Sequence, residues 1–123
     1  MGTFRKIVVD NSEYMWLFRY DDYDYQRIPY LLITAKAFPK ATLHINFPIK
    51  DHFLFNSGLP AVFQGQRVSI NLNQPLFVSQ IIQQCGKQVD MSNLTGYHYL
   101  NGIDILKTIG YELFLVTFSS YER

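Results

Sequence analysis

The chain has 123 residues, of which 48% are hydrophobic and 16% aromatic, and its formal net charge is +1. This length predicts a single globular domain over 1–123, and the composition excludes intrinsic disorder, which is typical of chains with low hydrophobicity and high charge. The nearly neutral charge indicates no nucleic acid as a partner, because affinity for nucleic acid depends on neutralising several phosphates.

The first 47 residues predict two β-hairpins. Runs of β-forming residues at 5–9 and 13–20 flank the turn-forming residues 10–12. Two further runs, 30–35 and 41–47, predict the second hairpin. In the run 13–20 both alternating faces are largely apolar, which is typical of a strand inside a sheet.

The middle of the chain predicts an irregular connection and then a third hairpin. Residues 48–60 lose the two-residue period, apart from a short predicted strand near 52–55. Strands at 61–63 and 66–72 are joined by Gln64-Gly65, where glycine supplies the positive φ of a tight turn.

The last third predicts two helices and a final strand. Apolar residues recur at helical spacing over 75–85, and Gly86 is placed to end this amphipathic helix. A short helix is predicted at about 102–109 with Asn101 as its cap, followed by a strand at 111–120. Together the elements predict an α+β domain with a mainly antiparallel sheet of six or seven strands and the first helix packed on one face.

The most unusual stretch is RYDDYDYQRIPY at 19–30, which combines acidic and aromatic residues. A calcium loop is excluded, because the glycine and distal glutamate of such a loop are missing. Three interpretations remain: a solvated loop, a surface for a protein partner or a second copy, and a small-ligand site. A second aromatic and polar cluster, GYHYLNG at 96–102, falls in a predicted loop. The candidate binding residues are Tyr20, Asp22, Tyr23, Asp24, Tyr25, Tyr97, His98 and Tyr99.

Residues that often carry catalysis or bind metals lack supporting context. Cys85 lies at the carboxyl end and on the apolar face of its helix, where a neutral, buried thiol is favoured. His44, on the polar face of its strand, His52 and His98 do not have the spacing of a zinc site. Ser57 lacks the flanking glycines of a nucleophile elbow. We therefore predict no catalytic residue, no metal site and no cofactor.

The cell compartment is predicted from two features. The single cysteine fits a reducing compartment, and no apolar run approaches the length of a transmembrane helix. We expect a cytoplasmic protein with no membrane association.

The two ends of the chain, RKIVVDNSEYMWLFRY and NGIDILKTIGYE, resemble the ends of small uncharacterised bacterial domain proteins with an aromatic amino-terminal hairpin. The resemblance implies a bacterial, stand-alone domain and carries no activity. We therefore expect a non-catalytic protein-interaction or self-associating domain that uses the Tyr/Asp-rich surface at 20–30. The alternative is a small enzyme or ligand-binding domain with a pocket lined by His, Asp and Tyr, in which His44 and His98 act together.

Overall fold

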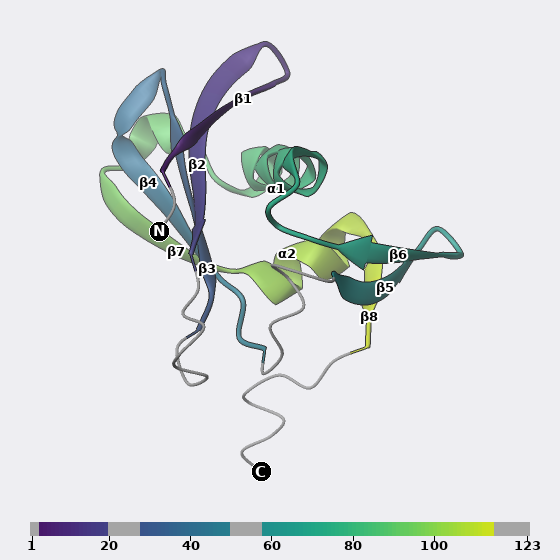
Figure 1. Cartoon of the computed structure of the whole chain (residues 1–123). Coiled ribbons are helices and arrows are strands. Elements are labelled where there is room, and N and C mark those ends of the chain that lie inside the picture. The colour runs from purple at the N-terminus through teal and green to yellow at the C-terminus, as the bar shows by residue number, and fades with distance from the viewer. Residues whose placement is uncertain (1–2, 20–27, 50–57, 115–123) are drawn as a thin grey trace.

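The computed structural model describes residues 3–19, 28–49 and 58–114 (Figure 1). Within these ranges the chain forms eight strands, two α-helices and one short 3-10 helix. In chain order they are β1 (Arg5–Val9), β2 (Ser12–Arg19), β3 (Tyr30–Ala35), β4 (Phe38–Asn46), β5 (Leu59–Phe63), β6 (Gln66–Ile70), α1 (Pro75–Gln88), η1 (Met91–Asn93), β7 (Gly96–Asn101), α2 (Gly102–Ile109) and β8 (Tyr111–Leu113). The α+β class predicted from the sequence is confirmed.

The strands belong to two sheets, so the prediction of a single sheet with six or seven strands is wrong. The larger sheet has five strands in the order β1-β2-β3-β4-β7, and the smaller has three in the order β6-β5-β8. All pairings are antiparallel except that of β4 with β7. One hydrophobic cluster joins the two sheets, with residues from both in contact.

The pairing of β4 with β7 corrects a second prediction. Residues 96–101 were expected in a loop, but they form a strand parallel to β4, with Ala41 opposite Gly96 and Asn46 opposite Asn101. Parallel strands need a long crossover connection. Here the crossover contains β5, β6, α1 and η1, which separate β4 from β7 along the chain.

The predicted hairpins are confirmed, and their turns follow from local residue types. Asp10 and Asn11 have φ angles of 51° and 67°, and Gln64 and Gly65 have φ angles of 53° and 78°. Two successive positive φ angles are typical of the turn that matches the right-handed twist of paired strands, and Asn, Asp and Gly adopt them most easily. The predicted strands near 52–55 and beyond Leu113 lie outside the described residues.

Both predicted helices are present. Helix α1 begins at Pro75 as expected but continues past Gly86 to Gln88, because the Val89 N–H bonds the Cys85 carbonyl and extends the helical hydrogen bonding. Helix α2 has the predicted cap: the Asn101 side chain accepts hydrogen bonds from two backbone N–H groups at the start of the helix. It ends at Gly110, whose φ of 127° favours glycine.

The helices cover one face of the larger sheet and leave the other open. Figure 1 shows α1 and α2 between the larger sheet and the smaller one. The inner face of the larger sheet buries alternate residues of β2, β3 and β4, and α1 buries its apolar stripe against them: Trp16, Phe18, Leu31, Ile33, Leu43, Ile45, Phe77, Val78, Ile81, Ile82 and Cys85. No described helix lies on the opposite face, which we call the open face.

Candidate functional site

The structure separates the predicted binding residues into two groups. Tyr20, Asp22, Tyr23, Asp24 and Tyr25 lie outside the described residues. Tyr97, His98 and Tyr99 lie in β7, at one edge of the larger sheet. Because side chains alternate along a strand, the two tyrosines share one face and the histidine lies on the other.

Tyr97 and Tyr99 belong to a cluster of rings on the open face. Their side chains are 59% and 61% exposed. His44, opposite Tyr99 in β4, has its ring centroid 4.8 Å from that of Tyr99 and 6.0 Å from that of Tyr97. On its other side the His44 ring lies 4.4 Å from Tyr30. We call Tyr30, His44, Tyr97 and Tyr99 the aromatic cluster.

His44 is the central residue of the aromatic cluster. Its Nδ1 atom is buried and has no hydrogen-bond partner among the described residues. Partial burial lowers the pKa of this imidazole, and an interaction with the Asn46 side chain works in the opposite direction. The neutral imidazole is therefore favoured, and the cluster has no positive charge at its centre at neutral pH.

Sequence reasoning placed His44 correctly on the polar face of its strand but did not join it to the tyrosines. Tyr30 and His44 are diagonal neighbours on one face of the antiparallel pair β3–β4. Tyr30 lies opposite Asn46, and Leu32 lies opposite His44. The alternation in the second hairpin was a signal for this contact. No local signal indicated the parallel pairing that brings Tyr97 and Tyr99 alongside.

The structure does not bring His44 and His98 to one site. His98 is opposite Leu43, whose side chain is buried on the inner face, whereas His44 lies on the open face. The backbone of the sheet separates the two imidazoles, so they cannot act together on one substrate. Within residues 3–19, 28–49 and 58–114, no three His, Cys, Asp or Glu side chains are grouped as metal ligands would be. His52 and Ser57 lie outside these ranges.

The edge strands of the two sheets differ in charge. β1 contains Arg5 and Lys6, β6 contains Arg67, and β8 contains Glu112. β7, with the sequence GYHYLN, contains no Lys, Arg, Asp or Glu. Charged side chains on an edge strand oppose its pairing with another chain. Of the edge strands in the described part of the chain, β7 alone lacks this protection.

Cys85 is buried as predicted, with 2% of its surface exposed. Burial raises the pKa of its thiol to about 12. Because the thiolate is the reactive form, iodoacetamide at pH 8 is expected to alkylate Cys85 at least about a hundredfold more slowly in the folded chain than in the unfolded chain. Mass spectrometry with and without guanidinium chloride measures both rates, and equal rates would contradict the burial of the thiol.

Neither α1 nor α2, the two helices of the described ranges, is long and apolar enough to cross a membrane.

Comparison with models of protein families, with curated proteins and with solved structures gave no match to this chain. The candidate site therefore depends on its own geometry: an uncharged edge strand with two exposed tyrosines that belong to a ring cluster on the open face.

Proposed function

We propose that the chain is a non-catalytic, self-associating domain in which β7 pairs with β7 of a second copy. The observation that carries this proposal is that an edge strand without charge also presents two exposed tyrosines. Tyrosine is enriched in protein interfaces, where its ring packs with little loss of conformational entropy and its hydroxyl stays hydrogen-bonded.

The hydrogen-bonding capacity of the edge favours a strand as the partner. An edge strand carries a row of N–H and C=O groups that a further strand can satisfy. Figure 1 shows β7 at the margin of the larger sheet, next to β4 and leading directly into α2. Pairing around a two-fold axis makes the two strands antiparallel and uses the same surface on both copies.

The register of such a pair follows from the sequence of β7. With the axis at His98, Tyr97 of one copy lies opposite Tyr99 of the other, and all four tyrosines lie on the open face. The two aromatic clusters then become continuous across the interface. Because β7 has no charged residue, this register brings no like charges together.

The position of the Tyr/Asp-rich stretch in the chain supports its participation in the same surface. It begins after Arg19 and ends before Tyr30, and these two residues pair across β2 and β3. Tyr30 is itself part of the aromatic cluster. The chain therefore leaves and re-enters the sheet beside this cluster, which supports a role for Tyr20, Asp22, Tyr23, Asp24 and Tyr25 in extending the surface.

The test is the concentration dependence of the mass in solution. Sedimentation equilibrium of the full chain is expected to give a dimer. The double variant Tyr97→Ala/Tyr99→Ala is expected to weaken association by about a thousandfold, since it removes four interface tyrosines from the dimer at about 1 kcal/mol each. Leu76→Ala is the matched control, because Leu76 is also highly exposed but lies on α1. It should leave the mass unchanged.

Two results would overturn the proposal. One is a wild-type chain that stays monomeric at the highest concentration reached. The other is a dimer that the tyrosine variant and the Leu76 control affect equally. Hydrogen exchange adds a local measurement: the β7 amides should gain protection as concentration rises, whereas the β1 amides, at the other edge, should not.

A further inference from the structure

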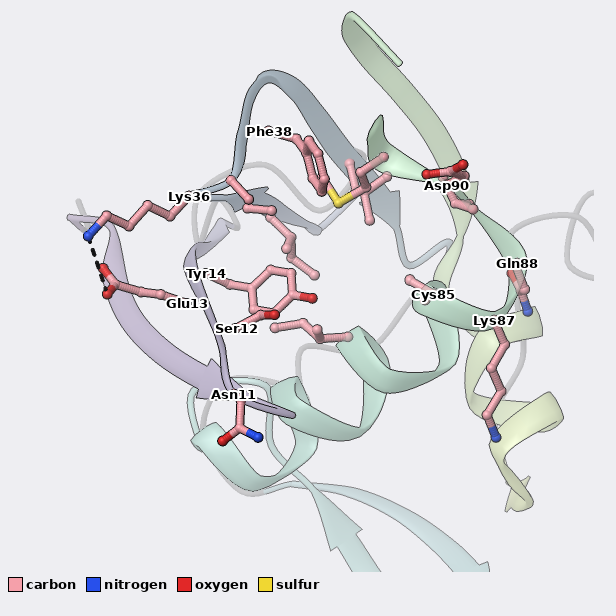
Figure 2. Close-up of a pocket in the computed structure, with 18 residues that line it drawn as sticks. Asn11, Ser12, Glu13, Tyr14, Lys36, Phe38, Cys85, Lys87, Gln88 and Asp90 are labelled. Atoms are coloured by element: carbon pink, nitrogen blue, oxygen red, sulfur yellow. Dashed lines mark ion pairs between the residues drawn. The ribbon is translucent and has the colours of Figure 1, made fainter. Parts of the chain in front are cut away.

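A cavity of about 850 Å³ lies on the inner face of the larger sheet, away from the β7 edge that self-association uses. It lies between the β1–β2 and β3–β4 turns on one side and the carboxyl-terminal end of α1 with η1 on the other (Figure 2). We call it the α1 cavity. Its volume falls in the range of about 300–1,000 Å³ that is typical of small-molecule sites.

The deep part of the α1 cavity is apolar. It is lined by side chains that also belong to the hydrophobic core, with a buried thiol beside them: Ile33, Leu43, Ile82 and Cys85. No polar or charged residue is buried anywhere in the described ranges. A charged group of a ligand would therefore lose its hydration here without gaining an opposite charge, which is strongly unfavourable.

Of the four charged residues that line the α1 cavity, Glu13, Lys36 and Asp90 have partners within the chain, and Figure 2 shows the Lys87 side chain pointing away from the cavity. Lys36 lies 3.8 Å from Glu13, and Figure 2 shows this ion pair at one end of the cavity. Asp90 accepts hydrogen bonds from the side chains of Ser92 and Asn93. These interactions leave the apolar walls as the main source of affinity.

Tyr14 provides one hydrogen-bonding group inside the α1 cavity. The residue is half-buried on the inner face of β2, and its hydroxyl has no hydrogen-bond partner among the described residues. Figure 2 shows the ring within the cavity, with the hydroxyl turned to the side where Cys85 lies. A phenol hydroxyl both donates and accepts, so it suits a neutral hydroxyl, carbonyl or amide group.

We infer that the α1 cavity binds a small, neutral and largely apolar molecule whose single polar group hydrogen-bonds the Tyr14 hydroxyl. The cavity's volume, the absence of buried charge and the Tyr14 hydroxyl beside the apolar wall together favour this class of ligand. This site is on the face opposite the aromatic cluster, so binding here is independent of self-association.

The test uses Nile red, a neutral fluorescent dye, titrated with the full chain and displaced by 1-decanol or by decanoate. We expect the dye to bind and decanol to displace it at least about tenfold more effectively than the decanoate anion, because the buried wall of the cavity offers no cation. Nile red that does not bind the wild-type chain, or decanoate that competes as well as decanol, would overturn the inference.

Gly86 allows the cavity to be obstructed without disturbing the fold. It lines the α1 cavity, and a Cβ at this position meets no heavy atom within 4 Å apart from its own helix. Gly86→Phe is expected to weaken dye binding by at least about fivefold, while Gly86→Ala should bind as wild type. Thermal unfolding followed by circular dichroism confirms that each variant is folded, and unchanged dye binding by folded Gly86→Phe would place the dye elsewhere and overturn the inference.

Tyr14→Phe tests the polar contact separately. It keeps the ring and removes the hydroxyl, so Nile red binding should stay the same and the affinity for decanol should fall by about threefold to tenfold, the effect of one neutral hydrogen bond. Equal affinity for decanol in both chains would show that the hydroxyl does not select the ligand. The variant Tyr97→Ala/Tyr99→Ala serves as the control for dye on the open face and should bind Nile red as wild type does.

Discussion

Trp16→Ala is expected to lower the free energy of unfolding by about 3–5 kcal/mol, the range for removing a fully buried large aromatic ring. Trp16 is 1% exposed and lies on β2, inside the larger sheet. Its ring packs into the hydrophobic core, and the Arg5 guanidinium carbon lies 4.5 Å from the ring centroid. Removing the indole leaves a cavity that strands on both sides hold open.

Urea unfolding followed by far-UV circular dichroism measures this effect, since the variant lacks the only tryptophan. Leu76→Ala is the control: Leu76 is 62% exposed, and its truncation should change stability by less than about 0.5 kcal/mol. Arg5→Ala should cost about 1 kcal/mol, because it removes a partly exposed cation–π contact. A Trp16→Ala effect no larger than that of Arg5→Ala would contradict the packing of the indole in the core.

Gly102→Ala is expected to lower the free energy of unfolding by about 2–3 kcal/mol, because a methyl group is forced into a filled core. A Cβ at Gly102 would lie 2.3 Å from the Phe47 ring, and Phe47 is fully buried. Gly102 is the first residue of α2, so glycine here permits the close approach of the helix to the chain just after β4.

Gly86→Ala is the matched control for this prediction. It makes the same chemical change in the other helix, where the new Cβ meets open space. It should stabilise the chain by about 0.4–1 kcal/mol through helix propensity and the entropy of the unfolded state. Equal stability of Gly102→Ala and Gly86→Ala would contradict the close packing of Gly102 against Phe47. In the double variant Gly102→Ala/Phe47→Leu, the smaller leucine should restore part of the free energy of unfolding that Gly102→Ala removes. The amount restored measures the energetic coupling between positions 102 and 47.

The aromatic cluster and the α1 cavity share β4 but lie on opposite faces of it. His44 lies on the open face, and the adjacent residue Leu43 lines the cavity. The variant Tyr97→Ala/Tyr99→Ala is therefore expected to change self-association and not ligand binding, and the variants Gly86→Phe and Tyr14→Phe are expected to change ligand binding and not self-association. Combining one variant of each kind should give additive effects, because the sites have no residue in common.

Local features of the sequence were sufficient for most of the secondary structure. Asp10-Asn11 and Gln64-Gly65 predicted the turns of the first and third hairpins, and Asn101 predicted the start of α2. The apolar period over 75–85 predicted both α1 and the burial of Cys85. In each case the signal depends on residues a few positions apart, whose side chains interact directly with the nearby backbone or lie on one face of a helix.

The sequence also indicated three of the four residues of the aromatic cluster. Tyr97 and Tyr99 were identified from their residue type, and His44 from the polar face of its strand. Their assembly into one cluster depends on the register of β4 with β7, in which His44 lies opposite Tyr99. The α1 cavity had no sequence signal, because its walls come from β2, β3, β4, α1 and η1 and its apolar wall residues have the pattern of ordinary core positions.

By itself, then, the sequence determined the hairpins, the two helices and the α+β class, while the tertiary structure decided how the strands are divided between two sheets. The stretch GYHYLN shows the reason. As an edge strand it buries little on either face, so it lacks the apolar alternation by which a strand is recognised. Its partner β4 is separated from it along the chain by β5, β6, α1 and η1, and such distant pairings depend on how those elements pack rather than on any local pattern.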